Sequence, residues 1–329
     1  MRAGRSRLAA PPVGPLSWVA TRHHSATPRR DLCMTDPPPP QRMDAAGLAV
    51  ATACCLLWGG NAVAAKFTIG DGALPPIGGA GLRFLLSLPV VAMACRGLGT
   101  SWRVERRHWW LLGVHGVLAA VQIGTFNWGT SRSEAGRSSV FINIHPLVVA
   151  PMAWLLLGER LGWRGAVGLL AAAAGVGVML AKPLMLGGGL EGDLVVLASG
   201  AIFGFQAIAQ KKTFPLIPPT TLLLLQSTLA IPLTLLYSAA FEGAGSYHFP
   251  TVAVWGLIYQ GLAVSGVAFT LWMVLLRRYP AGRLAAVAFL TPLFGIALGT
   301  LIRGEPFTLP LALGSGLVGL GIYLVTAEK

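Results

Sequence analysis

Aromatic and amide side chains recur at helical spacing in two apolar stretches of this chain. Trp58 and Asn61 stand three residues apart, and so do Phe203 and Gln206. Residues at that spacing share one face of a helix. A ring offers apolar contact area and an amide offers a donor and an acceptor, so the two faces could close on one small solute. The same faces could instead pack helices together, with each amide bonded to a backbone carbonyl.

These two stretches belong to a duplication that covers the chain from residue 44 onward. Three features return after the same interval of 146 residues: the tripeptide Ala-Gly-Arg at 135–137 and 281–283, a proline at 146 and 292, and a Gly-Glu pair at 158–159 and 304–305. Such a gap-free match between apolar segments indicates a duplicated membrane unit. We expect one repeat at 44–182 and a second at 183–329.

A third helical face adds a histidine to the candidate residues. His115, Gln122 and Phe126 follow one another at intervals of seven and four, which places them on one side of a helix. At the repeat interval Trp272 stands for Phe126, whereas glycine and alanine replace the two polar residues. We expect this asymmetric face to set selectivity, although a lone membrane histidine can also be a hydrogen-bonded structural residue.

The repeated prolines, Pro146 and Pro292, predict a kink in each of two apolar helices. Each proline leaves the carbonyl four residues earlier unpaired, and that carbonyl could bind a solute or simply permit the bend. Kinking is the favoured role. Asn143 and its counterpart Phe289 precede these prolines on the same helical face and are added to the predicted cavity, whereas His145 is expected to point to the opposite side.

Charge inside the apolar stretches is confined to one arginine. Arg83 must find a carbonyl, a water-filled cavity or an anion there, so structural pairing and carboxylate binding both remain open. All twelve Asp and Glu residues fall in the N-terminal tail, in loops or at helix ends. A carrier of cationic drugs typically needs a buried carboxylate. We therefore expect a neutral, zwitterionic or anionic substrate, and any proton coupling would fall to His115 or His145.

The composition places this chain in a lipid bilayer. It is 54% hydrophobic and only 11% charged, too apolar for a water-covered surface. Ten apolar runs are long enough to cross a membrane. They lie near residues 46–66, 75–95, 108–130, 136–157, 164–181, 193–213, 220–241, 252–276, 283–303 and 309–327. We predict an all-α integral membrane protein of ten transmembrane helices in two five-helix repeats. Because five is odd, the repeats are inverted, which is a geometry suited to alternating access, although a channel can also carry it.

The net charge of +13 follows membrane topology and gives no sign of nucleic-acid binding. Seven of the 25 basic residues lie before residue 43. If the N-terminus is cytoplasmic, the inner loops and C-terminus carry twelve basic residues and the outer loops carry five. This bias fits the positive-inside rule with both termini in the cytoplasm. The basic, proline-rich tail 1–43 predicts disorder. It indicates either a start assigned too early, with Met34 or Met43 as the true start, or a targeting segment.

No constellation in the chain predicts catalysis, a metal site or a cofactor. The four cysteines have no zinc-like spacing, and no nucleophile has a histidine-acid pair beside it. Gly314-x-Gly316-x-x-Gly319 resembles a dinucleotide fingerprint, but it lies in the last apolar run without a preceding strand. It predicts close helix packing, as do the glycine pairs 200/204 and 295/299, within one protomer or between the two protomers of a homodimer.

The repeated Gly-Glu pairs predict helix ends. A glycine there terminates a helix, and the following glutamate, Glu159 or Glu305, is expected to accept hydrogen bonds from the free N–H groups of the next helix.

Together these motifs resemble the EamA family of the drug/metabolite transporter superfamily. The resemblance rests on Leu57-Trp58-Gly59-Gly60-Asn61-Ala62-Val63, on Arg83-Phe84 and on the paired proline and Gly-Glu motifs, and covers residues 46–327. It implies a ten-helix inner-membrane carrier that exports amino acids or other small metabolites. The second half departs from the motif at 203–206, which leaves selectivity open. An importer or nucleotide-sugar type antiporter is the alternative within the class, and a channel or scaffold the alternative outside it.

Overall fold

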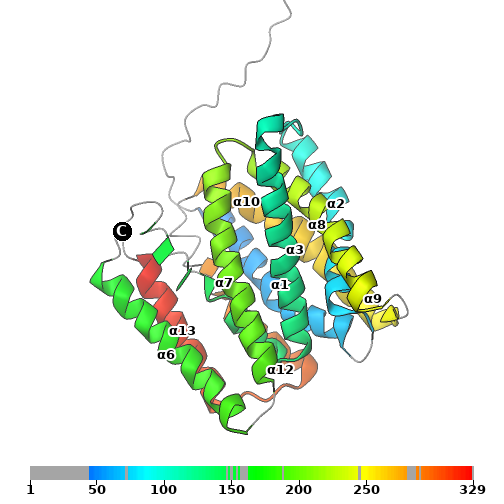
Figure 1. The fold of residues 1–329 in the computed structure, drawn as a ribbon. Coiled ribbons are helices and arrows are strands. Elements are labelled where there is room, and N and C mark those ends of the chain that lie inside the picture. Colours follow the sequence, from blue (N-terminus) through cyan, green and yellow to red (C-terminus); the bar gives the residue numbers. More distant parts are fainter. Residues whose placement is uncertain are drawn as a thin grey trace, which may run out of the picture. The chain divides into compact units, whose positions relative to one another are not determined.

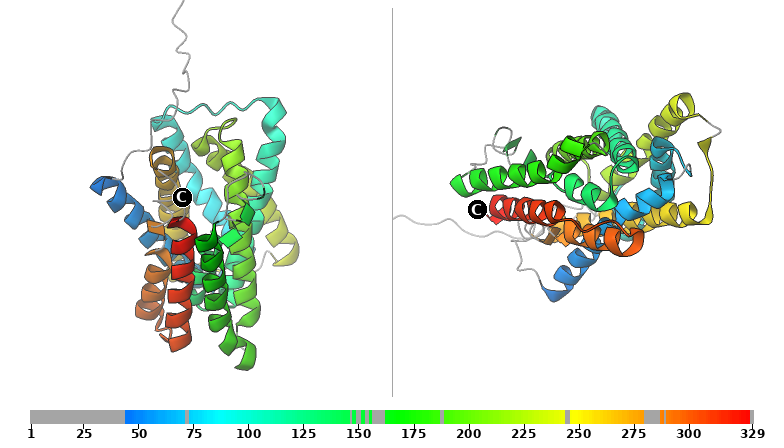
Figure 2. Two further views of the ribbon diagram at one scale, coloured as in Figure 1. Left: turned by 90° about the vertical axis from the view of Figure 1, so that its left-hand side faces the viewer. Right: turned by 90° about the horizontal axis from the view of Figure 1, so that it is seen from below.

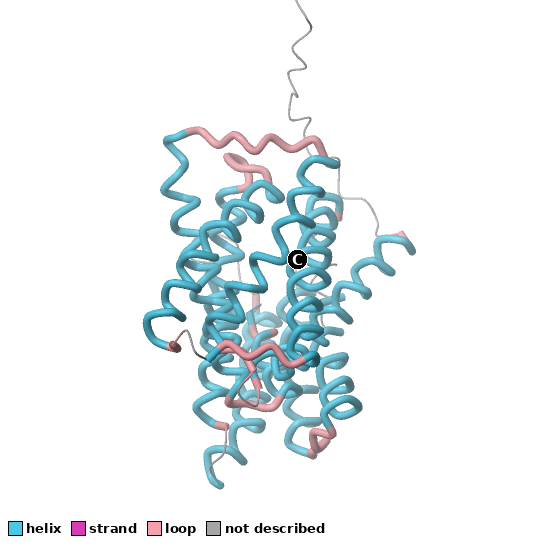
Figure 3. Tube along the Cα trace, turned by 90° about the vertical axis from the view of Figure 1, so that its right-hand side faces the viewer, coloured by secondary structure: helices cyan, strands magenta, loops and turns pink. Residues whose placement is uncertain are grey.

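The computed structural model describes residues 44–70, 73–145, 147–148, 151–152, 155, 162–186, 189–243, 246–279, 287–288 and 290–327. This part of the chain consists of helices joined by turns and loops, without a strand (Figure 3). The all-α fold predicted from the sequence is therefore confirmed. The tail 1–43 and parts of the predicted fourth and ninth spans lie outside the described residues.

The helices of the two halves follow one another in the same order (Figure 1). The first half contains α1 (Ala45–Ile69), α2 (Pro76–Gly97), the short 3₁₀ turn η1 (Arg106–His108), α3 (Trp109–Ser131), α4 (Ala135–Ile142) and α6 (Trp163–Leu186). The second half contains α7 (Leu190–Thr213), α8 (Pro219–Phe241), a continuous helix made of α9 (Thr251–Ile258), the π-helix η3 (Tyr259–Ala268) and α10 (Phe269–Arg278), then α12 (Leu290–Arg303) and α13 (Leu309–Ala327).

Length and composition make most of these helices membrane spans. Six of them are long and apolar enough to cross a bilayer, and three shorter apolar helices lie at 163–179, 290–303 and 309–321. Many large apolar side chains on their outer surfaces are exposed, among them Trp110, Leu236 and Leu301. Such a surface is stable against lipid tails, where a helix also satisfies its own backbone hydrogen bonds.

Proline pairs start the second helix of each half. Pro75-Pro76 and Pro218-Pro219 begin α2 and α8, with the first proline of each pair in an extended conformation and the second as the first helical residue. Proline suits that position because it lacks an N–H and its φ is already helical. The same local chemistry thus builds equivalent helices in both halves.

The packing contacts between helices follow the repeat, because each contact described below has an equivalent when the two halves are interchanged. Helix α2 packs against its counterpart α8, and α6 packs against its counterpart α13. Contacts of α1 with α12, which belongs to the ninth predicted span, are mirrored by contacts of α7 with α4, which belongs to the fourth. Contacts of α3 with α7 are mirrored by those of η3 and α9 with α1. The halves are therefore interleaved about a pseudo-twofold axis, which is the arrangement expected of inverted repeats.

Helices α6 and α13 lie side by side in all views (Figures 1 and 2). A Cβ added to Gly175 would lie 2.6 Å from the carbonyl oxygen of Gly314, and one added to Gly314 would lie 2.7 Å from that of Gly175. The predicted close packing is confirmed at Gly314. Gly316 has open space around it, so the prediction was wrong for that residue, because it lies on another side of α13.

This difference gives a matched pair of substitutions. We expect Gly314→Ala to lower stability by about 1–3 kcal/mol, because the methyl group would push α13 off α6. Gly316→Ala should leave stability unchanged or raise it by up to about 1 kcal/mol, since alanine favours a helix over glycine. Unfolding by SDS in mixed micelles, followed by circular dichroism, measures both. Equal effects of the two changes would contradict the close approach.

The start of α1 is tied to the end of α10 by one carboxylate. Asp44 Oδ1 accepts from Gly47 N at 2.8 Å and from the Tyr279 hydroxyl at 2.7 Å. The Tyr279 hydrogen bond, followed by that of Gly47, lowers the pKa of Asp44 below its usual value. A lowered folded pKa stabilises the fold above the unfolded pKa of about 4 and loses that stabilisation as the pH falls through the folded value.

We therefore expect a pH-dependent difference between the wild type and Asp44→Asn. The wild type should have the higher melting temperature at pH 7, because only the ionised carboxylate receives both donors strongly. The gap should close below about pH 4 as Asp44 becomes protonated. Thermal unfolding in detergent across that range measures it, and a gap that stays constant with pH would contradict the role of Asp44.

Candidate functional site

A cavity of about 100 Å³ lies among α1, α2, α3, α7, the η3–α10 helix and the segments around α4 and α12. Its lining combines rings, aliphatic side chains and a few polar groups. The described lining residues are Trp58, Asn61, Arg83, Gln122, Ile123, Phe126, Ile142, Asn143, His145, Phe203, Val264, Phe269, Trp272, Ala288 and Thr291. A mostly apolar lining with convergent polar groups is the usual character of a small-molecule site.

Most lining residues come in pairs that the duplication relates. Trp58 and Phe203 are 145 residues apart. Four further pairs are 146 residues apart: Ile123 with Phe269, Phe126 with Trp272, Ile142 with Ala288, and His145 with Thr291. The cavity therefore lies on the pseudo-twofold axis, where the two halves meet, and both halves build equivalent parts of its wall.

The aromatic residues form a continuous series of edge-to-face contacts. The ring centroid of Trp58 lies 4.8 Å from that of Trp272 and 5.4 Å from that of Phe269. Phe203 continues the series at 6.4 Å from Phe269 and 4.8 Å from the His145 ring. These tilted arrangements match the quadrupoles of the rings, so they hold the apolar wall in a defined shape.

Five polar atoms of the lining are buried without a hydrogen-bond partner in the described structure. They are Trp58 Nε1, Asn61 Oδ1, Arg83 Nη1, His145 Nδ1 and Thr291 Oγ1. A buried polar atom without a partner costs about 1–3 kcal/mol. Five such atoms around one cavity make it a candidate site for a polar solute or for water.

Eight of the residues predicted from the sequence meet at this cavity: Trp58, Asn61, Arg83, Gln122, Phe126, Asn143, Phe203 and Trp272. Gln122 is held there by its neighbour helix, since its side-chain amide donates to Ser199 Oγ at 3.1 Å. Phe289 and Pro146 lie outside the described residues, and Pro292 is buried within α12.

Two predicted cavity residues lie elsewhere. His115 is buried between α3 and α7, where Nε2 is 3.0 Å from Thr213 Oγ1, whose hydroxyl donates to Ala209 O. The imidazole thus joins two helices, which was the structural alternative. Gln206 is buried but is not among the described lining residues. Helical spacing gave the correct face for Phe203, but the amide one turn further on does not reach the cavity.

The predicted direction of His145 was wrong. His145 lines the same cavity as Asn143 and packs its ring on Phe203. The prediction assumed one unbroken helix, but α4 ends at Ile142, and residues 143–144 form a turn in which Asn143 Nδ2 bonds to Ser139 O at 2.8 Å. The turn changes the direction of the chain, so helical periodicity no longer relates these two side chains.

Comparison with known proteins decides the family. The model of the EamA-like transporter family matches residues 45–181 and again residues 190–327. This chain belongs to the EamA-like transporter family. It is accordingly a multi-pass membrane transporter and not an enzyme, as the sequence motifs predicted.

Several EamA relatives are similar along most of their length. An uncharacterized transporter of Bacillus subtilis, YoaV, is 23% identical over 82% of this chain and 93% of its own. A probable amino-acid metabolite efflux pump of Salmonella typhimurium is 25% identical over 82% of this chain and 91% of its own. A probable terminal-alkyne amino-acid exporter of Streptantibioticus cattleyicolor is 28% identical over 65% of this chain and 71% of its own. A crystal structure with a TM-score of 0.65 and 19% identity covers 86% of this chain and 96% of its own, and shares the fold.

Sequence reasoning missed several lining residues of this EamA protein, notably Ile123, Phe269 and Thr291. A signal for them was present in the duplication. Each is the repeat counterpart of another lining residue, and His145 and Thr291 directly precede the two repeated prolines. Extending every predicted cavity residue to its counterpart would have found Phe269 and Thr291 once Ile123 and His145 were recognised.

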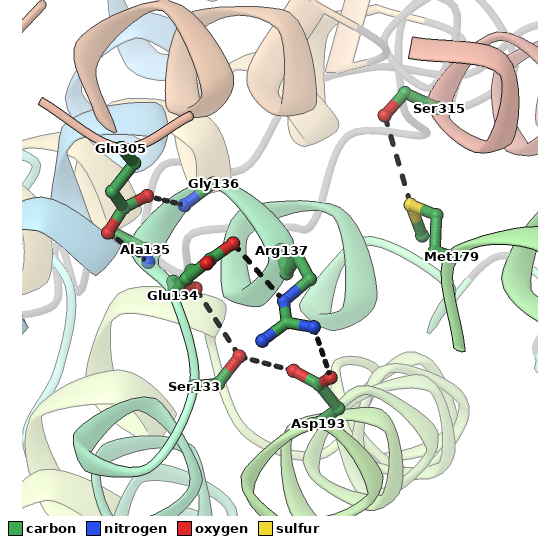
Figure 4. A network of polar contacts seen from close by, with 9 residues as sticks. All are labelled: Ser133, Glu134, Ala135, Gly136, Arg137, Met179, Asp193, Glu305 and Ser315. Carbon is green, nitrogen blue, oxygen red and sulfur yellow. Dashed lines mark hydrogen bonds and ion pairs between the residues drawn. The ribbon is translucent and has the colours of Figure 1, made fainter. Parts of the chain in front are cut away.

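The glutamate of the second Gly-Glu pair caps a helix, but not the one predicted. Glu305 precedes α13, yet its carboxylate oxygens accept from Ala135 N at 2.7 Å and Gly136 N at 2.8 Å, at the start of α4 in the other half (Figure 4). Glycine makes this approach feasible, because Gly299 of α12 lies against Gly136. The prediction considered only the next helix in sequence, whereas packing brings a helix from the other repeat closer.

A second carboxylate of the second half does the same for α2. Glu242 accepts from Ile77 N at 3.0 Å and Gly78 N at 2.9 Å. A carboxylate that receives two free N–H groups and faces the positive end of a helix stabilises that helix start. Both contacts join the halves, so they resist separation of the halves where α2 and α4 begin.

Proposed function

We propose that this protein is an inner-membrane exporter of a small neutral, zwitterionic or anionic metabolite, an amino acid or a related compound, and that it works by alternating access. The observation that carries this proposal is the lining of the cavity by five repeat-related pairs. A site on the pseudo-twofold axis is equally related to both halves, so exchanging their conformations would open it to one side and then to the other.

The repeats 44–182 and 183–329 would act as the two interleaved halves of this cycle. The contacts of Glu305 with α4 and of Glu242 with α2 would hold the halves together on one side. They would have to break when the cavity opens there. We expect both termini in the cytoplasm from the distribution of basic residues, which would make this side the extracytoplasmic one.

The substrate class follows from the groups around the cavity. No carboxylate is among its described lining residues, so a permanent cation would find no counter-charge, and its burial would cost several kcal/mol. The names of two relatives, a probable amino-acid metabolite efflux pump and a probable terminal-alkyne amino-acid exporter, agree with a zwitterionic or anionic substrate. The cavity of about 100 Å³ is smaller than the roughly 300–1,000 Å³ of sites for drug-sized ligands, which argues against a nucleotide sugar.

Two successive experiments test this function. Comparison of secreted metabolites between a deletion strain and an overproducing strain should reveal one compound or a small group that follows the protein. In proteoliposomes, that compound should then show saturable uptake that is accelerated by unlabelled compound on the opposite side. Flux that rises linearly with concentration and shows no counterflow would indicate a channel, and no flux of any compound would leave a scaffold.

A further inference from the structure

The buried guanidinium of Arg83 has one free nitrogen at the cavity. Arg83 is 1% exposed and lines the cavity from α2. Its Nε donates to Ser265 Oγ at 2.5 Å, and its Nη1 is buried without a partner in the described structure. An arginine side chain stays charged and carries five donors. One edge of the guanidinium is therefore used by the protein, while the rest can serve a ligand.

The charge of Arg83 is not balanced within the described structure. The ion pairs found there join Arg107 to Glu105, Arg132 to Glu191, and Arg137 to both Glu134 and Asp193. None of them includes Arg83. A charge in the hydrocarbon region needs a partner, a carbonyl or water, so an anion entering the cavity would be attracted to this residue.

The hydrogen bond to Ser265 fixes the direction of the guanidinium. Ser265 lies in the π-helix η3, which packs against α2. The packing is close, since a Cβ on Gly261 would lie 3.2 Å from Arg83 O. The π-helix is rare in proteins and, where it occurs, is frequently found at functional sites; η3 is ten residues long. Here the π-helix is the element that holds Arg83 Nε. The Nη groups therefore form the edge of the guanidinium that this helix does not hold.

The duplication did not preserve a second anchor. The second spans are related by an interval of 143 residues, as Pro75-Pro76 and Pro218-Pro219 are. At this interval Gln226 stands for Arg83, and its Oε1 accepts from Gln210 Nε2 at 3.2 Å. The rings of the cavity are therefore symmetric, but its cation is not. A ligand would find one cationic position and, in the lining of the same cavity, the free Asn61 Oδ1, which accepts a hydrogen bond.

We propose that Arg83 is the specificity-determining residue of the cavity and binds one carboxylate group of the substrate through its Nη edge. The proposal rests on the proposed function and narrows its substrate class from neutral, zwitterionic or anionic compounds to compounds with a carboxylate. The rings of Trp58, Trp272 and Phe269 contact the apolar part of the same molecule. An ammonium or amide N–H of the ligand donates to Asn61 Oδ1.

The test is a binding assay on the purified full-length protein, read by tryptophan fluorescence and by thermal unfolding. The probes are the standard protein amino acids, sodium phenylacetate, its neutral amide phenylacetamide, the cation phenethylamine, and sodium chloride as the simple anion. At least one carboxylate should bind saturably, at least about tenfold tighter than its amide, because a charged bidentate contact is lost in the amide. Phenethylamine and chloride should not compete with it.

Variants separate anchoring from folding. Arg83→Lys keeps the charge but not the fork, and should weaken carboxylate binding about tenfold or more while the melting temperature changes little. Ser265→Ala removes the partner of Arg83 Nε and should weaken carboxylate binding roughly three- to tenfold. Both must leave binding of phenylacetamide, where it is measurable, unchanged. Absence of binding by every carboxylate, equal binding of the amide, competition by chloride, or indifference to both variants would each overturn the proposal.

Failure here is distinguishable from failure of the proposed function. Saturable counterflow of a compound without a carboxylate, unaffected by Arg83→Lys, would support the carrier function and contradict carboxylate binding by Arg83. Arg83-dependent carboxylate binding without counterflow in proteoliposomes would support carboxylate binding by Arg83 and contradict the carrier function.

Discussion

Replacing Asp193 with alanine should lower the free energy of unfolding by about 3 kcal/mol or more. Asp193 is fully buried in the first turn of α7, and its Oδ2 lies 3.1 Å from Arg137 Nη1 of α4. The Ser133 hydroxyl donates to the other carboxylate oxygen (Figure 4). Removing one partner of a buried ion pair typically costs about 3–5 kcal/mol. Arg137 keeps a second, more exposed partner, Glu134, at 3.4 Å, so we expect the loss to lie at the lower end of that range.

Two changes serve as controls for Asp193→Ala. Glu191 also lies in the first turn of α7, but its side chain is 70% exposed and 4.0 Å from Arg132. Glu191→Ala should therefore shift stability by less than about 0.5–1 kcal/mol. Asp193→Asn retains an acceptor for Ser133 and should fall between the two. SDS unfolding measures all three variants, and equal losses for Asp193→Ala and Glu191→Ala would contradict the account of this pair.

The second large effect concerns transport. Asn61→Ala should reduce the transport rate at limiting substrate roughly five- to tenfold, since it removes a cavity acceptor worth about 1–1.5 kcal/mol. Asn61 Oδ1 is buried at the cavity with no partner in the described structure, so its loss should not destabilise the fold. Uptake in proteoliposomes, normalised to the amount of folded protein, gives the effect.

Gln206→Ala is the matched control, because Gln206 is the repeat counterpart of Asn61 and is buried but not among the described lining residues. It should lower the yield of folded protein and leave the rate per folded molecule near that of the wild type. A similar loss of rate in both variants would restore the symmetric pair of amides that the sequence predicted. An unchanged rate for Asn61→Ala would remove Asn61 from the site.

The sequence predicted the fold well because its signals were long and duplicated. Apolar runs and the interval of 146 residues needed no knowledge of packing. It predicted several cavity residues that one unbroken helix carries, as for Trp58 with Asn61 and for Gln122 with Phe126. Spacing within a helix depends only on the helix itself, so these residues were accessible to the argument. The same spacing failed for His115 in α3 and for Gln206 in α7.

The errors arose where the packing of helices, or a break in a helix, decides which side chains meet. The turn after Ile142 brought His145 into the cavity, and a helix from the other repeat took the carboxylate of Glu305. The partner of His115 is Thr213, 98 residues away. None of these contacts has a local sequence signal, because each depends on which helices become neighbours.

The central claim is that the cavity on the pseudo-twofold axis opens alternately to the two sides of the membrane. The most direct measurement is labelling of Thr291→Cys, in a chain whose four native cysteines are replaced, by a membrane-impermeant thiol reagent. Thr291 lines the cavity and is 2% exposed. We predict modification in both right-side-out and inside-out vesicles, with transported substrate slowing both reactions. Labelling from only one side, with and without substrate, would contradict alternating access.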